Sequence, residues 1–500
     1  MQPSSTEAPQ ASSASHVYSS AKELLEDLRG GKLSSRELLE QYIARIERRD
    51  GALNAVVARD FAGARKAADA ADLARGRGEG LGPLHGLPLT LKDTWEVPGM
   101  PCAAGAPEYR EHRPTEPADV VRRLQEAGAI VFGKTNVPYL ASDIQTYNEV
   151  YGTTNNPWGT ERTPGGSSGG AAAALAAGFT PLEVGSDLAG SIRIPAHYCG
   201  VYGHKPTYGV VSFRGHVPGP PGTLSEPTLA VAGPMSRSAA DLRLLLDVLL
   251  GPPRERSAWS LKLPEPPQRL EDYRVLLWTD DPLCPVDDEL REQYQRLGQK
   301  LGEAGVKVTV GPPRGFRLEQ FYALYLRGLG ALLGAALPAR QRHLMGLTGA
   351  LMPVLSRALG APADFGHFLR GINQRSAHSR LQQERTARLG ADFHAVFEDF
   401  DVILMPPALT TAIPHDKRPS LMQRKIRVNG QQRAYSDLFV WIALASLLGL
   451  PATSAPLGAT SSGLPFNVQI VGAAYRDYTT IRFAELLAPL MGGFARPPGF

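Results

Sequence analysis

From about residue 84 onward, short apolar runs alternate with segments that carry helix signals, and this alternation constrains the fold more than any other feature. The run "GLPLTLKD" is typical of a strand bounded by Gly86 and Asp93. "EPADVVRRLQEAG" predicts a helix, with Pro117 near its first turn and Gly128 beyond its end. Three segments continue the alternation: a strand at 129–133, a helix at 169–178 and a strand at 179–187. The pattern favours an α/β fold, a large, mostly parallel mixed sheet covered by helices on both faces.

Three regions divide the chain. Residues 1–17 are rich in Ser, Ala, Pro and Gln and have neither a basic start nor an apolar core, so we expect a disordered leader and not a secretory signal. Residues 18–500 are expected to form a single domain that opens with two helices, because Ser20 and Ser34 each begin an S-x-x-E capping box. Within it, residues 316–400 predict a mainly helical region.

Charge and cysteine content exclude several functions. The 53 basic and 49 acidic residues leave a net charge of +4, which gives no reason to expect nucleic acid or membrane binding. Cys102, Cys199 and Cys284 are too few and too dispersed for a disulfide framework or a cysteine zinc site. A reduced, cytoplasmic setting suits them. No stretch of about 18 apolar residues predicts a spanning helix.

A match to the phosphate-binding loop pattern lies at Gly128–Thr135, "GAIVFGKT". In a nucleotide site the loop follows a strand and precedes a helix, so that the helix N-terminus faces the phosphates. Here a helix precedes the motif, and its middle residues AIVF predict a buried strand. We therefore reject a nucleotide site and expect Lys134 to be a strand-end lysine, either solvated or paired.

"GGSSG" at residues 165–169 matches the nucleophile elbow of α/β-hydrolases. A helix is expected after it, but the preceding "NPWGTERTP" is not a strand, which an elbow requires. A glycine-rich hairpin that lets backbones approach closely is the structural alternative. That alternative does not account for the adjacent Ser167 and Ser168, which are small hydroxyl side chains suited to an active site.

Three segments together carry the chemistry: "LPLTLKD" with Lys92, "TPGGSSGG" with Ser167 and Ser168, and "VGSDLAGSIRIPA" with Ser191. The run Gly165–Pro206, which contains all three serines, resembles the pattern of the amidase signature family across more than forty residues. "GPMSRSAADLRLLLDVL", "GLPATSAPLG" and "FNVQIVG" add to the match. The chain resembles this family over nearly its whole length.

The resemblance implies a Ser–cis-Ser–Lys triad: Ser191 as nucleophile, Ser167 as bridging hydroxyl after a cis peptide bond, and Lys92 as general base. A serine hydroxyl needs a base to take its proton. Lysine serves only when neutral, and with a free pKa near 10.4 about one part in 2,500 is neutral at pH 7. Burial lowers that pKa, and an apolar strand precedes Lys92. The structural alternative is a lysine paired with Asp93.

The resemblance also implies supporting groups. Backbone N–H groups around the nucleophile would hold the oxyanion formed when the carbonyl is attacked; they belong to Leu188, Ala189, Gly190 and Ser191. Asp187 and Arg193 are expected to brace this loop as an ion pair. Ser168 either joins the catalytic network or makes only hairpin hydrogen bonds.

Two positions depart from the family pattern. Ala189 stands where the family usually has glycine, and it would be strained if its φ were positive. It affects the expected substrate preference more than the reaction. His204 replaces an apolar residue common in the family, and we expect it to be a core or loop variant.

The resemblance implies hydrolysis of a carboxamide to a carboxylic acid and ammonia or an amine, with side activity on esters or carbamates. It requires no metal, flavin or nucleotide cofactor. The expected partner is a small-molecule amide, without nucleic acid or stable membrane insertion, and a homodimer is left open. Two alternatives stay open: a glutaminase subunit of a glutamyl-tRNA amidotransferase, and a non-catalytic amidase-like binding protein.

The segment "FYALYLRGLGALLGAAL" allows two interpretations. It forms either a lid, which shapes the substrate entrance or touches a membrane, or a helical layer that packs on the sheet.

Overall fold

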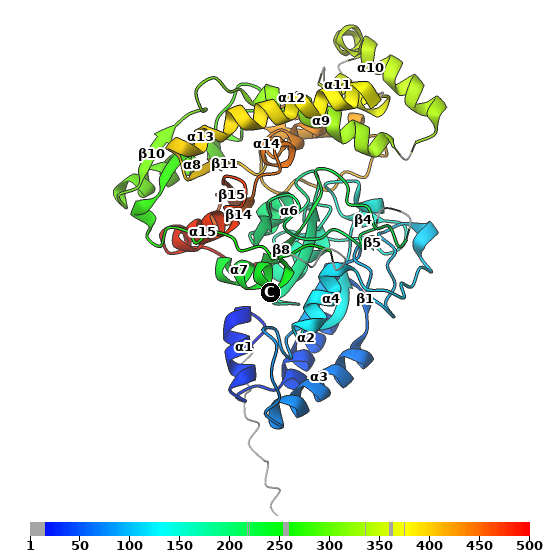
Figure 1. Cartoon of the computed structure of the whole chain (residues 1–500), viewed down its shortest axis with the longest axis vertical. Coiled ribbons are helices and arrows are strands. Elements are labelled where there is room, and N and C mark those ends of the chain that lie inside the picture. The colour runs from blue at the N-terminus through cyan, green and yellow to red at the C-terminus, as the bar shows by residue number, and fades with distance from the viewer. Residues whose placement is uncertain are drawn as a thin grey trace, which may run out of the picture.

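The protein is described by a computed structural model (Figure 1). It describes residues 16–217, 219, 221–253, 260–335, 337–359, 364–374 and 376–500. The helices of these residues are α1 (Ala21–Arg29), α2 (Ser35–Arg49), α3 (Phe61–Gly76), α4 (Asp119–Glu126), α5 (Gly169–Ala176), α6 (Arg193–Cys199), α7 (Ala239–Leu249), α8 (Asp288–Glu303), α9 (Leu318–Gly334), α10 (Ala339–Leu359), α11 (Phe365–Ile372), α12 (Ser376–His394), α13 (Val396–Asp399), α14 (Ala443–Leu447) and α15 (Asp477–Met491).

A mixed sheet forms the centre of the fold. In the described part of the chain it contains eight strands, in the order β10-β9-β11-β15-β14-β7-β8-β6. These strands are β6 (Leu182–Asp187), β7 (Tyr202–Lys205), β8 (Val231–Ser236), β9 (Arg274–Leu277), β10 (Lys307–Val310), β11 (Val402–Met405), β14 (Ala452–Ala459) and β15 (Pro465–Val471). The α/β class expected from the sequence is confirmed.

The expectation that this sheet would be mostly parallel is wrong. β9 pairs in parallel with β10 and β11, whereas the other pairings among the described strands of the sheet are antiparallel. β6 and β7 run in the same direction, as a strand–helix–strand unit requires, but β8 inserts between them and is antiparallel to both. The short connection from β14 to β15 also returns the chain antiparallel. Local patterns locate strands, but they do not reveal which later strand is inserted between two earlier ones.

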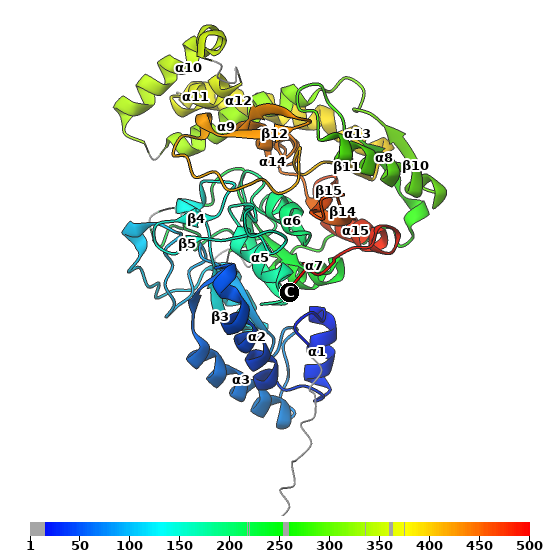
Figure 2. The ribbon, with the colours of Figure 1, turned by 180° about the vertical axis from the view of Figure 1, so that it is seen from behind.

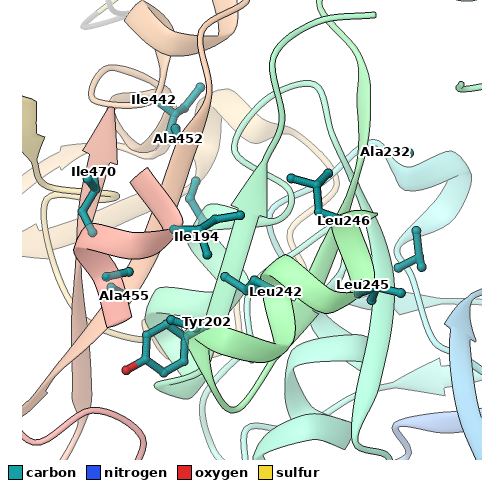
Figure 3. Close-up of a cluster of buried hydrophobic side chains, with 14 of the residues drawn as sticks. Ile194, Tyr202, Ala232, Leu242, Leu245, Leu246, Ile442, Ala452, Ala455 and Ile470 are labelled. Atoms are coloured by element: carbon teal, nitrogen blue, oxygen red, sulfur yellow. The ribbon is translucent and has the colours of Figure 1, made fainter. Parts of the chain in front are cut away.

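Helices cover both faces of the sheet, as expected. Neighbouring residues of a strand point to opposite faces. In β14 the Ser454 hydroxyl donates to the carbonyl of Arg193 in α6, at 3.2 Å, whereas the Thr453 hydroxyl donates to Thr480 in α15, at 2.9 Å. Figure 3 shows buried side chains from the sheet and from helices packed on it: Ile194, Leu242, Leu246, Ala452 and Ile470.

A smaller sheet carries Lys92. Its strands are β1 (Val56–Arg59), β2 (Pro88–Lys92) and β3 (Ile130–Thr135), in the order β1-β3-β2. β2 packs against β6 of the large sheet. The Thr90 hydroxyl donates to Glu183 at 2.6 Å, and the Trp95 indole donates to the Val184 carbonyl at 2.9 Å. These contacts fix the end of β2 beside the end of β6. Two short hairpins complete the strands: β4 (Tyr147–Asn148) with β5 (Gly152–Thr153), and β12 (Lys425–Val428) with β13 (Gln431–Ala434).

The N-terminal helices begin as predicted. Ser20 and Ser34 each form a complete capping box, with Glu23 and Glu37 respectively. The expected disordered leader lies almost entirely outside the described residues. Its described end, however, is packed, because Val17 is buried and its carbonyl accepts a hydrogen bond from Arg237 at 3.0 Å.

The segment Gly128–Thr135 is a helix-to-strand connection and not a phosphate loop. α4 precedes it, Gly128 turns with φ +88°, and β3 follows. Lys134 is fully buried; its amine pairs with Asp93 at 2.9 Å and donates to the Pro101 carbonyl at 2.8 Å. Of the two predicted states for Lys134, the paired one is therefore correct, and Asp93 is the partner of Lys134 and not of Lys92.

Residues 316–400 are largely helical, as predicted, and Figures 1 and 2 show α10 and α11 at the end of the molecule opposite to α1 and α3. α9 buries one face through Phe321, Tyr325 and Leu329, which favours a packed helical layer for the start of the apolar segment. α10 exposes three leucines, Leu344, Leu347 and Leu351. Across the described residues, no helix has both the length and the apolar character needed to cross a membrane. Contact of this region with a substrate or a membrane stays a prediction.

Candidate active site

Three connections between elements meet at one place. Lys92 is the last residue of β2, Ser167 and Ser168 immediately precede α5, and Ser191 lies between β6 and α6. The Ser168 N–H donates to the Ser191 carbonyl at 3.2 Å, which joins the two serine segments directly. All four residues are buried, and Ser191 is 8% exposed.

The Lys92 amine is surrounded by hydroxyl groups. Its Nζ lies 2.7 Å from Ser167 Oγ, 2.9 Å from Ser168 Oγ and 2.9 Å from Ser186 Oγ. Burial lowers the pKa of Lys92 to about 7, although the negative charges of Asp187 and Glu183 partly oppose this shift. A large fraction of this lysine is therefore neutral at neutral pH.

The segment before α5 requires glycine. The Gly166–Ser167 peptide bond is cis. Gly165 has φ +86°, and a Cβ on it would lie 2.8 Å from Pro195 Cα. A Cβ on Gly166 would lie 2.6 Å from the Asp143 carbonyl oxygen. The two glycines thus let this backbone pack tightly against α6 and residues 143–145. No strand directly precedes Ser167, so the nucleophile elbow considered from the sequence is not formed here.

Asp187 and Arg193 form the expected ion pair, with 2.8 Å between Arg193 Nη2 and Asp187 Oδ1, and both side chains are fully buried. Asp187 also accepts from the backbone N–H groups of Gly190 at 2.9 Å and Ile192 at 3.1 Å. Burial alone would raise the pKa of Asp187, but attraction to Arg193 outweighs it and lowers the pKa to about 2. The carboxylate stays charged and holds the turn that carries Ser191.

The backbone of the loop before Ser191 answers one open question and changes one expectation. Gly190, and not Ala189, is the residue with positive φ, at +85°, so the alanine is not strained. The Gly190 N–H is occupied by Asp187, which corrects the expected set of four oxyanion donors. In the described residues, the N–H groups of Leu188, Ala189 and Ser191 have no hydrogen-bond partner. Of the four predicted donors, these three N–H groups are the ones left free in the described part of the chain.

Sequence reasoning missed several residues of the site. Ser186 contacts Lys92, and His216 Nε2 lies 2.9 Å from Ser186 Oγ. The Tyr325 hydroxyl of α9 donates to the Leu188 carbonyl at 3.2 Å. Ser186 directly precedes Asp187 in the diagnostic run, which was a usable signal. His216 and Tyr325 lie far along the chain in segments without a motif. The other departure noted in the sequence, His204, is a buried core residue that contacts Thr453 and Asp477.

A cavity of about 450 Å³ lies elsewhere, lined by Arg162, residues 410–416, residues 425–427 and Tyr435. None of Lys92, Ser167 and Ser191 contributes to it. We therefore assign the candidate chemistry to the lysine–serine cluster and not to this cavity. Among the described residues, no group of three or more His, Cys, Asp or Glu side chains is placed to hold a metal ion.

Comparison with known proteins identifies the class. The family model described as Amidase matches residues 37–481, and the chain belongs to this family, the amidase signature enzymes. It is accordingly an amidohydrolase. The chain is 33% identical to one of the subunits of the glutamyl-tRNA(Gln) amidotransferase of Synechococcus sp. (strain CC9605), over 95% of this chain and 96% of that one. It is 32% identical to the fatty-acid amide hydrolase 2-B of Danio rerio, over 96% and 90%.

A solved structure supports the fold. A bacterial aryl acylamidase of the amidase signature family superposes with a TM-score of 0.78, covering 95% of this chain and 96% of that chain. Its sequence identity of 24% limits this likeness to the fold.

Proposed function

We propose that the chain hydrolyses a carboxamide to a carboxylic acid and ammonia or an amine, with Ser191 as nucleophile, Ser167 as bridging hydroxyl and Lys92 as general base. The observation that carries the proposal is the buried Lys92 amine, 2.7 Å from the Ser167 hydroxyl, in a segment that is hydrogen-bonded to Ser191.

In the acylation step, Ser191 Oγ forms a bond to the amide carbon. Its proton moves to Ser167, whose own proton moves to Lys92. The C–N bond then breaks, and the proton on Lys92 returns through Ser167 to the departing nitrogen. The free N–H groups of Leu188, Ala189 and Ser191 are the donors proposed for the oxyanion, where such preorganised donors have their largest effect.

In the deacylation step, water attacks the acyl carbon and loses a proton to Lys92 through Ser167. The bond to Ser191 Oγ breaks, and the serine regains a proton by the same route. Esters are easier to cleave than amides, and carbamates are about as difficult to cleave as amides. We therefore expect side activity on esters and on carbamates.

A glutaminase role in a glutamyl-tRNA amidotransferase is the second candidate, because a relative at 33% identity belongs to such an enzyme. Ala189 and the sequence "GHKPT" depart from the family pattern and favour a free-standing amidase. The non-catalytic binding protein that the sequence left open is not proposed, because the chain belongs to the amidase family and retains the three candidate triad residues.

The proposal includes a small-molecule amide as the partner and no nucleic acid. It places the enzyme in the cytoplasm, since Cys102, Cys199 and Cys284 are buried and unpaired. A homodimer stays open.

The test is Ser191→Ala. This variant should lower kcat on amides by about 10⁴-fold or more with unchanged circular dichroism and melting temperature. It should also escape labelling by a serine-reactive fluorophosphonate. The matched control is Ser461→Ala, at an exposed turn, which should behave as the parent. Normal amide hydrolysis by the Ser191 variant would refute the assignment.

A further inference from the structure

One contact of Lys92 outside the proposed relay leads on to a further side chain. The Lys92 amine lies 2.9 Å from the Ser186 hydroxyl, which in turn lies 2.9 Å from Nε2 of His216. Neither residue has a role in the relay from Ser191 through Ser167. Both are therefore candidates for positioning the base.

Backbone and ring contacts fix the position of His216 relative to the segment that follows Lys92. Its backbone forms a bridge with Trp95, three residues after Lys92. Its ring stacks on Phe213, with 4.3 Å between centroids, and meets the Trp95 ring edge-on at 4.7 Å. The Trp95 indole is itself bonded to the Val184 carbonyl in β6. The imidazole thus has a defined orientation toward Ser186.

If Lys92 acts as the base, the Ser186 hydroxyl must donate its proton to a group other than the Lys92 amine. A neutral amine has two N–H groups and one lone pair, and as a base Lys92 must direct the lone pair at Ser167. The two N–H groups then go to Ser168 and Ser186, so both hydroxyls must send their own protons elsewhere. The Ser168 hydroxyl donates to the Ser186 carbonyl at 3.5 Å. His216 Nε2, 2.9 Å from the Ser186 hydroxyl, can accept the proton of that hydroxyl when the ring carries its own proton on Nδ1.

His216 can accept at neutral pH. Burial keeps the pKa of His216 well below its usual value, and the positive charges of Lys92 and Lys134 lower it further. Its Nδ1 is buried and has no hydrogen-bond partner among the described residues, so the contact with Ser186 decides which ring nitrogen carries the proton. Without this acceptor, the Ser186 proton would turn to the Lys92 lone pair and compete with Ser167.

We propose that His216, acting through Ser186, directs the lone pair of Lys92 toward Ser167 and is thereby a positioning residue for the general base. This inference rests on the proposed function, because it presumes that Lys92 takes a proton from Ser167. It assigns His216 no contact with the substrate.

The test compares His216→Leu, which removes the acceptor, with His216→Gln, whose side-chain oxygen can replace Nε2. The Leu variant should lower kcat about tenfold, the effect of losing one hydrogen bond, with little change in KM. The Gln variant should recover most of kcat. His394→Leu, at the exposed end of α12, is the matched control and should leave kcat unchanged.

The pH profile separates orientation from loss of packing. If His216 only excludes water from the site, its removal hydrates Lys92. The midpoint of the rise of kcat/KM with pH then shifts to higher pH, toward the ordinary lysine pKa. If His216 orients the lone pair of Lys92, kcat falls and this midpoint does not shift to higher pH. The other charged groups around the pair, Asp187, Glu183 and Lys134, are the same in every variant.

Ser186→Ala completes the test, because its effect on kcat should not add to that of His216→Leu if both act as one unit. Three outcomes would each overturn the inference. The first is a kcat of the His216→Leu variant equal to that of the parent, and the second is a shift of its kcat/KM midpoint to higher pH. The third is a His216→Gln variant with a kcat no higher than that of His216→Leu. If Ser191→Ala retained turnover, the proposed function itself would fail. If Ser191→Ala were inactive and His216→Leu fully active, only this inference would fail.

Discussion

At the scale of the residue, the site depends on the charge of one lysine. An amine can accept a proton only when uncharged, and an exposed lysine is almost entirely charged at pH 7. Lys92 is fully buried among the hydroxyls of Ser167, Ser168 and Ser186, which replace water around the amine without adding charge. Its pKa of about 7 follows from this burial.

The pH dependence of the reaction follows from that pKa. Below about pH 7 Lys92 carries a proton and cannot act as a base, and above it the lysine is neutral. We therefore expect kcat/KM for an uncharged amide to rise with pH and to level off above a midpoint near 7. A steady-state pH series from 5 to 10 measures it. A midpoint near 10 would show that the lysine is solvated.

The alanine at position 189 gives a second prediction at this scale. Its backbone does not have positive φ, so glycine there relieves no strain and only makes the unfolded chain more flexible. Ala189→Gly should lower the free energy of unfolding by about 0.4–1 kcal/mol and leave amide hydrolysis in place. Urea unfolding and turnover assays check both effects; a gain in stability would contradict the observed backbone.

At the scale of the element, the turn from β6 to α6 is built around the buried Asp187–Arg193 pair. The Asp187 carboxylate accepts hydrogen bonds from the backbone N–H groups of Gly190 and Ile192, on both sides of Ser191. Arg193 also donates to Gln469 of β15 at 2.6 Å. The nucleophile turn is therefore anchored to the central sheet.

Arg193→Met should break this anchor. The substitution leaves the Asp187 charge buried without its partner, which costs about 3–5 kcal/mol. We expect a large fall in the midpoint of urea unfolding and loss of turnover. The control is Arg388→Ala, which breaks the exposed pair with Glu384 and should change the midpoint far less. Equal effects of the two substitutions would contradict a structural role for Arg193.

At the scale of the whole molecule, distant segments build the site. The small sheet supplies Lys92, the large sheet supplies the turn with Ser191, and α9 reaches this turn through Tyr325, which bonds to Leu188. The mainly helical region thus contacts the turn that carries Ser191, although it has no recognisable motif.

Activity of the isolated chain decides between the two leading functions. A free-standing amidase should hydrolyse a simple amide such as benzamide without partners, because the proposed catalytic groups all lie in this chain. An amidotransferase subunit should instead show glutaminase activity only with its partner subunits. Purified chain is assayed for ammonia release from benzamide and from glutamine. Release from glutamine alone, and only with added partners, would favour the second function.

Local sequence was sufficient for the helix starts at Ser20 and Ser34, the strands around Lys92 and Ser186, and the family with its three candidate catalytic residues. These features depend on side chains close together in the chain or on a continuous motif. The tertiary structure alone decided the antiparallel insertion of β8 and the arrival of His216 beside Ser186. Each joins segments that no local periodicity links, and which segments meet is determined by the packing of the whole chain.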